Sequence, residues 1–268
     1  MPFRTIDGSS DQELHPNEYM FQVQNNGRKV LVMHNRNNEE FSFLKKFKDK
    51  RINSNGVAQA AYISSLVDER ITLVACSGLA GTGKSFLAVA AAIEGLQNGS
   101  YKSIKFVKPF YRAGDSDAIG TLPGELDEKI RPYLHSYMDI LKELCFDEAY
   151  LSNMLKKKQI EFEPIEFMRG RTFRNSFIIV DEAQSLSWDM IYLIVSRLGE
   201  GSKLVVLGDL NQIDSRETSF TSGLNKLVTS AACKNSPLAS SHILDICCRS
   251  ETAKLAHDIN KELRRSSG

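Results

Sequence analysis

A glycine-rich stretch between two apolar segments has the plainest chemistry in this sequence. It reads SGLAGTGKSF at residues 77–86 and fits the pattern G-x-x-x-x-G-K-[ST] in full. The glycines let the backbone fold around an anion with its N–H groups inward, and the following helix would direct its positive end at the same point. Lys84 would reach the β- and γ-phosphates of a nucleoside triphosphate, and the Ser85 hydroxyl would ligate Mg²⁺. The expected nucleotide contacts are Gly78, Leu79, Ala80, Gly81, Thr82, Gly83, Lys84, Ser85 and Phe86.

Two adjacent carboxylates form a second candidate site. The segment FIIVDEAQ, at 177–184, is an apolar run that ends in Asp181 and Glu182. Ligands of open α/β sheets bind at the carboxyl ends of the strands, where this pair would lie. Asp181 would hold Mg²⁺ directly or through water, and Glu182 would act as the general base that orients an attacking water. A catalytic glutamate favours hydrolysis over transfer to a small molecule.

Two further polar residues follow later strand-like runs. Gln212 lies in KLVVLGDLNQID, and its amide could sense the loss of a γ-phosphate and pass the change to a neighbouring surface. Taken alone, the same residues fit a simple turn equally well. Arg249, in LDICCRSETAKLAHDIN, could stabilise transition-state charge in its own site or in a neighbouring copy. Its position fits a surface arginine at the start of a helix equally well.

An alternation of strands and helices would position these residues. Continuous apolar runs of strand length, typical of strands buried on both faces of a parallel sheet, occur at Ile71–Cys76, Ile104–Val107, Phe177–Val180 and Lys203–Leu207, with a weaker one at Ile243–Cys247. Helical patterns lie at Lys84–Gln97, Glu125–Leu144, Trp188–Leu198 and Glu251–Leu263. This alternation predicts an α/β fold, a doubly wound, mainly parallel sheet with helices on both faces.

Two regions fall outside that alternation. About 65 residues separate the second strand-like run from the third, far more than such a link needs, and they include GTLPGELDEKIRPYL and the lysines 156–158. We expect a helical insertion over one edge of the sheet, at about 111–165. Residues 1–40 are polar, with one strand-like piece at Lys29–Met33. The predicted organisation is a weakly packed N-terminal arm over 1–52 and a P-loop domain over 53–268.

The composition is that of an ordinary globular chain. Of 268 residues, 42% are hydrophobic and 25% are charged, and the net charge of +1 excludes a strongly basic tail protein but not a local basic groove. The five cysteines have no zinc-site spacing, which suits reduced thiols, with Cys76 and Cys247 as core residues. No apolar run approaches the ~20 residues of a membrane span, and the N-terminus lacks the apolar region of a secretory signal. The expected location is cytoplasmic.

These elements, in this order, resemble the N-terminal core of superfamily 1 helicases, and more closely the PhoH-like family of single-domain ATPases. The similarity runs from about Asn53 to Asn260, through GLAGTGKSFLAVA, LPGELDEKIRPYL, IEFMRGRTFRNSFIIVDEAQ and SRLGEGSKLVVLGDLNQID. The LPGELDEKIRPYL and MRGRTF segments are not general features of phosphate-loop proteins. The resemblance implies a single RecA-like P-loop domain with ATP and Mg²⁺ as cofactors. It also implies that ATP hydrolysis drives an RNA helicase activity.

The resemblance also implies roles for single residues. Gln59 stands where helicase-like proteins carry a glutamine that reads adenine, with an exposed helical glutamine as the alternative. Gln212 matches the γ-phosphate sensor, Arg249 matches an arginine that reaches the γ-phosphate, and Arg197 stands where the family keeps another arginine. Lys108 departs from the pattern, because the family has arginine there and the planar guanidinium fork is lost.

A chain with one phosphate loop supplies only one wall of the ATP site that a translocating helicase closes between two domains. We therefore expect a homo-oligomer, which the resemblance suggests is a hexameric ring, with an arginine supplied in trans by Arg249, Arg197 or the RGR at 169–171. RNA or single-stranded nucleic acid is the expected partner, and no membrane is expected. The candidate contacts combine cations with rings suited to base stacking: Lys108, Phe110, Tyr111, Arg112, Arg169 and Arg171.

Alternatives stay open on three points. Phe110 and Tyr111 could instead pack under the insertion. The nucleotide could control assembly with a partner, as in a regulatory switch, without any movement of a strand. An ATP-linked ribonuclease is a weaker alternative, because outside the ATP site the sequence has no acidic cluster with two-metal spacing. Stimulation of ATP turnover by single-stranded RNA or DNA would separate a motor from a switch.

Overall fold

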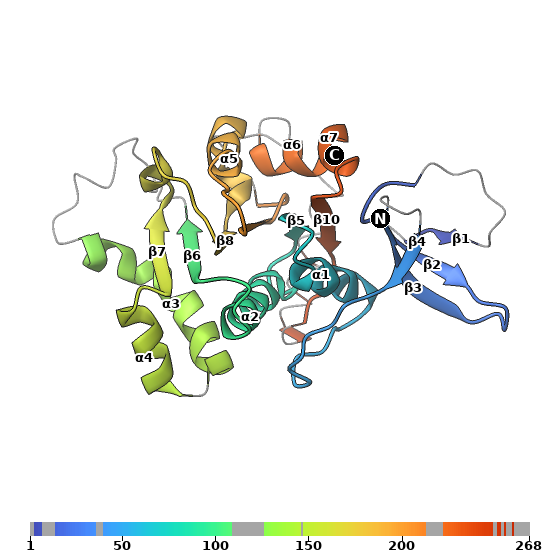
Figure 1. The fold of residues 1–268 in the computed structure, drawn as a ribbon, viewed down its shortest axis with the longest axis horizontal. Coiled ribbons are helices and arrows are strands. Elements are labelled where there is room, and N and C mark those ends of the chain that lie inside the picture. The colour runs from blue at the N-terminus through green and yellow to red at the C-terminus, as the bar shows by residue number, and fades with distance from the viewer. Residues whose placement is uncertain are drawn as a thin grey trace.

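The computed structural model describes residues 3–6, 14–35, 40–108, 126–145, 147–212, 222–248, 251–252, 255 and 259, apart from the side chains of 126–134, 166 and 167. Within these residues the chain forms a six-stranded sheet, in the order β10-β5-β9-β8-β6-β7 (Figure 1). A second, four-stranded sheet has the order β1-β2-β3-β4. The larger sheet carries the phosphate-loop pattern and the acidic pair.

Every pairing in the larger sheet is parallel. Its strands are β5 (Leu73–Gly78), β6 (Ser103–Lys108), β7 (Ile160–Pro164), β8 (Ser176–Val180), β9 (Lys203–Gly208) and β10 (Ala239–Leu244). β8 and β9 are buried along their whole length, as their continuous apolar sequences predict. The predicted α/β fold with a doubly wound, mainly parallel sheet is confirmed.

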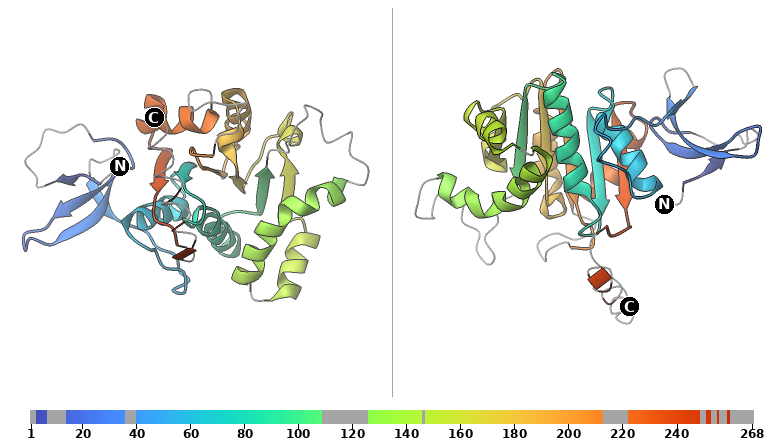
Figure 2. Two further views of the ribbon diagram at one scale, coloured as in Figure 1. Left: turned by 180° about the vertical axis from the view of Figure 1, so that it is seen from behind. Right: turned by 90° about the horizontal axis from the view of Figure 1, so that it is seen from below.

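Helices cover both faces of this sheet (Figure 1, Figure 2). One face carries α1 (Val57–Val67), α2 (Lys84–Gln97), α3 (Leu126–Cys145) and α4 (Glu148–Lys156); the other carries α5 (Trp188–Val195), α6 (Gly223–Thr229) and α7 (Ala231–Lys234), with the 3₁₀ turns η2 (Ile165–Met168) and η3 (Ala183–Ser185). Side chains alternate along a strand, so Val74 and Cys76 of β5 join the core under the first layer and Ala75 joins the core under the second. Cys247 is also buried, as predicted, while most of the expected helix 251–263 lies outside the described residues.

The predicted insertion is only partly helical, which corrects the expectation from sequence. After α3 and α4 the chain forms β7, which pairs with β6 and becomes the edge strand of the sheet. This strand reads IEFEP, and its two glutamates set it apart from the apolar runs that predicted the other strands. Both carboxylates form ion pairs with Lys105 of β6, at 3.2 Å for Glu163. Because the neighbouring strand supplies the countercharge, an acidic segment can take the edge position.

The N-terminal region has more strand structure than the single piece predicted at 29–33. Its strands are β1 (Thr5–Ile6), β2 (Tyr19–Val23), β3 (Lys29–Asn35) and β4 (Glu40–Phe43). β2 and β3 form an antiparallel hairpin in which Met20 lies opposite Val32, and both side chains are buried. β2 reads YMFQV, with Gln22 as its one polar residue, but only Tyr19 and Met20 are buried, so its short run stood out little from the polar sequence around it.

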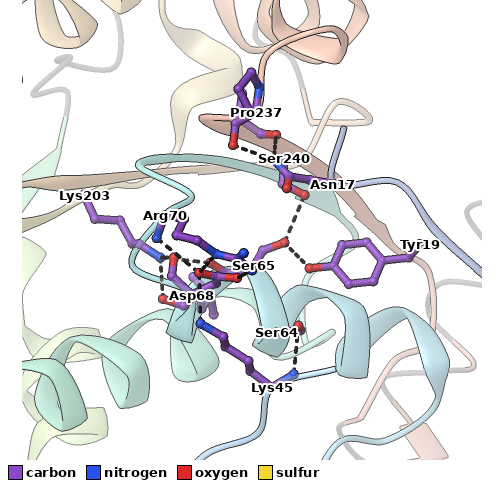
Figure 3. A network of polar contacts seen from close by, with 12 residues as sticks. Asn17, Tyr19, Lys45, Ser64, Ser65, Asp68, Arg70, Lys203, Pro237 and Ser240 are labelled. Atoms are coloured by element: carbon purple, nitrogen blue, oxygen red, sulfur yellow. Dashed lines mark hydrogen bonds and ion pairs between the residues drawn. The ribbon is translucent and has the colours of Figure 1, made fainter. Parts of the chain in front are cut away.

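Polar contacts join this hairpin to the main domain (Figure 3). The Asn17 side-chain amide donates to the carbonyls of Pro237 and Ala239, both at 2.9 Å. The Tyr19 hydroxyl lies 2.8 Å from the Ser65 hydroxyl of α1, and burial raises the pKa of Tyr19 to about 12. The tyrosine therefore stays a neutral hydrogen-bonding group. The arm is packed on α1 and on the segment that leads into β10.

The carboxyl end of α1 is capped by a buried lysine from β9. The Lys203 ammonium donates to the carbonyls of Ser65, Leu66 and Asp68 at 2.9, 2.6 and 2.8 Å (Figure 3). Burial lowers the pKa of Lys203 to about 7, while the last carbonyls of a helix favour a cation. Burial would raise the pKa of Asp68, but hydrogen bonds from Arg70 and Lys45 outweigh it and lower the pKa to about 2. These bonds fix α1, whose first turn reaches the phosphate loop.

Candidate functional site

The phosphate loop connects β5 to α2 at the carboxyl edge of the larger sheet. Gly81 and Gly83 have φ angles of 79° and 86°, which side chains disfavour. A Cβ at Gly78 would lie 2.2 Å from the Leu244 carbonyl oxygen, so the close passage of β10 also requires glycine. The buried Lys84 ammonium donates to the Gly78 carbonyl at 2.5 Å and to the next carbonyl at 2.8 Å. A positive charge is therefore held inside a tight glycine turn at the start of a helix.

Gln59, in the first turn of α1, packs against the back of this loop. It is 6% exposed; its Nε2 donates to the Thr82 carbonyl at 2.9 Å, and its Oε1 accepts the Asn55 N–H at 2.6 Å. The backbone N–H of Cys248, beyond β10, donates to the Gly81 carbonyl at 2.8 Å. The Gln59 side-chain amide thus ties α1 to the loop. The expected adenine contact of Gln59 stays a prediction.

Asp181 and Glu182 follow β8 at the same edge. The Asp181 carboxylate accepts hydrogen bonds on both oxygens, from the Glu182 N–H at 3.0 Å and from the Tyr137 hydroxyl at 2.6 Å. Burial and the nearby Asp181 charge raise the pKa of Tyr137, so its hydroxyl is the donor. Glu182 is exposed and has a φ angle of 56°, a left-handed conformation that is uncommon for this residue type. Such backbone strain concentrates at functional sites, which supports the choice of this turn.

The Gln184 side chain links the acidic pair to the end of β9. Its Nε2 donates to Glu182 Oε2 at 2.8 Å, and its Oε1 accepts the Asp209 N–H at 3.1 Å. A Cβ at Gly208 would lie 2.6 Å from Gln184 Oε1, so the glycine makes room for this amide. Sequence reasoning quoted Gln184 as part of DEAQ but assigned it no role. Its position two residues after Glu182 was the only signal.

Asp209 and Gln212 lie between the phosphate loop and the acidic pair, because β9 separates β5 from β8 in the sheet. Asp209 Oδ1 accepts the Asn211 N–H at 2.9 Å, and the Gln212 N–H donates to the Asp209 carbonyl at 2.9 Å. Asp209 Oδ2 is buried and has no hydrogen-bond partner within the part of the chain that the structure describes. Gln212 is exposed, and its role as γ-phosphate sensor stays a prediction.

The donor chemistry of the site fits magnesium. Ser85, in the first turn of α2, offers a hydroxyl, and Asp181 offers a carboxylate at the end of β8. Mg²⁺ prefers such oxygen donors, keeps several waters and usually shares a nucleotide's phosphates. Across the described ranges no group of three or more His, Cys, Asp or Glu side chains could hold a metal ion by itself. The two donors therefore suit an ion that arrives with a nucleotide.

Arg197 lies at the opposite edge of the sheet from Asp181. Its carbonyl accepts the Phe173 N–H at 2.9 Å, just before β8 begins. The length of β8, at about 3.3 Å per residue, therefore separates the two. Arg197 Nε is buried with no hydrogen-bond partner among the residues described. The expected role of Arg197 as an arginine supplied in trans stays a prediction, and Arg249 lies outside the described residues.

The structure brings together only part of the predicted nucleic-acid surface. Lys108 Nζ lies 5.9 Å from the Tyr137 ring centroid. Arg171 donates to both carboxylate oxygens of Glu163 at 3.0 Å, and Arg169 is exposed. The remaining candidates lie outside the described residues: Phe110, Tyr111 and Arg112. The described helices also include none that is long and apolar enough to span a membrane.

Comparisons with known proteins find relatives that are described as PhoH-like proteins. A PhoH-like protein of Bacillus subtilis is 37% identical over 175 residues, which are 65% of this chain and 53% of that protein. A PhoH-like protein of Synechocystis is 38% identical over 156 residues, 58% of this chain and 46% of that protein. The chain thus spans about half the length of the curated relatives it matches.

Among solved structures, the Pif1 helicase from Candida albicans aligns over 80% of this chain and 44% of that chain, with 18% identity and a TM-score of 0.39. A likeness at that level supports no inference about function. The family model described as "PhoH-like protein" matches residues 51–253, a range that includes the phosphate loop, the acidic pair and Gln212. Because this match covers most of the chain, the protein belongs to the PhoH-like family.

Proposed function

We propose that this chain binds ATP with Mg²⁺ and hydrolyses the γ-phosphate. The observation that carries the proposal is the meeting of three strand ends at one sheet edge, where Lys84 follows β5, Glu182 follows β8 and Asp209 follows β9. Gln184 joins the last two of these ends through hydrogen bonds of 2.8 and 3.1 Å. A phosphate cradle and a candidate general base at one edge of the sheet suit attack by water on a phosphoryl group.

Each residue has a distinct part in this proposal. Lys84 would leave its two carbonyl partners for the phosphates, and the ion held by Ser85 and Asp181 would neutralise their charge. Glu182 would accept a proton from the attacking water. Gln212 would lie beside the γ-phosphate and respond to its loss.

We further propose that hydrolysis is coupled to RNA or single-stranded nucleic acid in a homo-oligomer, with a hexameric ring as the expected form. The position of Arg197 supports an arginine supplied in trans, because β8 separates it from the phosphate edge of its own chain. The cations Lys108 and Arg169 support contact with a nucleic-acid backbone.

Phosphate release from ATP, with and without single-stranded RNA, tests the proposal. Lys84→Ala should abolish turnover, and Glu182→Gln should retain ATP binding while turnover is lost. Normal turnover in either variant would contradict the site assignment. Solution mass with and without ATP and Mg²⁺ tests assembly. ATP-dependent assembly without stimulation by RNA or DNA would instead support a regulatory switch.

A further inference from the structure

The insertion helix α3 reaches the acidic pair through one side chain. Tyr137 is 3% exposed, and its hydroxyl donates to Asp181 Oδ2 at 2.6 Å. The other carboxylate oxygen accepts the Glu182 N–H at 3.0 Å. The Asp181 backbone is fixed as well, because its N–H donates to the Val107 carbonyl at 3.1 Å. Bonds to both oxygens and to the backbone therefore set the orientation of this carboxylate.

The tyrosine ring is itself held by β6. Its centroid lies 4.5 Å from the centroid of the Phe106 ring, and Lys108 Nζ lies 5.9 Å above it. Phe106 and Lys108 are two residues apart on the strand beside β8, so both face the layer of helices that contains α3. A hydroxyl on a ring packed in this way has little freedom to swing away from Asp181.

We propose that Tyr137 is a positioning residue that orients the Asp181 carboxylate for magnesium and so ties metal binding to the insertion. The inference rests on the proposed function, because it takes Asp181 as a ligand of the ion that accompanies ATP. Partners of a ligating carboxylate fix its orientation, and their loss typically costs about 10–100-fold in metal affinity. A carboxylate oxygen can accept more than one bond, so the phenol orients Asp181 without occupying it.

The variant Tyr137→Phe removes the hydroxyl and keeps the ring against Phe106. Affinity for a fluorescent ATP analogue is measured with Mg²⁺ and with EDTA, in a Glu182→Gln parent that preserves the nucleotide. We expect Tyr137→Phe to reduce the Mg²⁺-dependent gain in affinity about tenfold and to leave the affinity in EDTA unchanged. Tyr150→Phe, at an exposed tyrosine of α4, is the matched control and should keep the full gain.

A double-mutant cycle with Asp181→Asn shows whether the effect passes through this carboxylate. In the Asp181→Asn background, Tyr137→Phe should leave the Mg²⁺-dependent gain unchanged. Phe106→Leu, which loosens the ring and keeps the hydroxyl, should lose part of the same gain. A full gain in Tyr137→Phe would overturn the inference, and so would an equal loss with Mg²⁺ and with EDTA, which a purely structural role predicts. A parent protein without any Mg²⁺-dependent gain would refute the proposed function instead.

Discussion

The variant Gln184→Leu removes the amide that links the candidate general base to the end of β9. Gln184 is 3% exposed, and leucine fills a similar volume without a donor or an acceptor. Two hydrogen bonds are lost, the one to Glu182 Oε2 at 2.8 Å and the one from the Asp209 N–H at 3.1 Å. A buried N–H without a partner costs about 1–3 kcal/mol of stability, so the variant should unfold at a lower urea concentration.

The larger effect should fall on catalysis. A positioned general base contributes about 10²–10⁴-fold to a rate, and a displacement of about 1 Å can cost about 10²-fold. Without the amide, the exposed Glu182 side chain loses the partner that sets its direction. We therefore expect kcat for ATP to fall by about 10–100-fold while KM changes little, because Gln184 lies outside the phosphate loop.

Steady-state phosphate release measures both constants. Gln97→Leu, at an exposed glutamine ending α2, is the matched control and should keep the parent's kcat. Gln184→Glu keeps an acceptor for the Asp209 N–H but places a second carboxylate beside Glu182, so it should lose as much rate. An unchanged kcat in Gln184→Leu would refute the reasoning that this amide positions the base.

Three further predictions concern stability and the loop. Lys203→Met should lower the free energy of unfolding by about 3 kcal/mol in urea titrations, because the carbonyls of Ser65 and Leu66 lose their ammonium donor; no change would contradict the capping role. Burial lowers the pKa of His242 to about 3, so between pH 6.5 and 3 the unfolded chain binds a proton that the native state does not. The free energy of unfolding should therefore decrease as the pH is lowered through this range, and His242→Asn should flatten this decline. Gly78→Ala places a Cβ 2.2 Å from the Leu244 carbonyl oxygen and should weaken binding of a fluorescent ATP analogue at least tenfold. Normal affinity would show that β10 moves aside without disturbing the phosphate loop.

Much of the larger sheet could be predicted because four of its six strands are continuous apolar runs, whereas the weaker run at Ile243–Cys247 overlaps β10 only at residues 243–244. β5, β6, β8 and β9 lie within one or two residues of the runs that predicted them, and α2 begins and ends where its pattern predicts. β7 could not be found in this way, because its two glutamates are neutralised by Lys105 on a neighbouring strand and by Arg171 beyond it in the chain. In the N-terminal arm β3 was predicted in part, as the piece at 29–33, but β2 and its pairing were missed, since β2 and β3 each complete the other's buried face.

The sequence by itself determined the phosphate loop and the acidic pair. Both are local, since each depends on consecutive residues at the end of a buried strand, and turn geometry follows from those residues alone. Only the tertiary structure decided that Gln184 meets Asp209, that Tyr137 meets Asp181, and that the Arg197 backbone lies at the end of β8 away from Asp181. These contacts depend on strand order and on the path of α3 across the sheet. Local patterns leave both open, because the energy that selects them comes from packing between segments far apart in the chain.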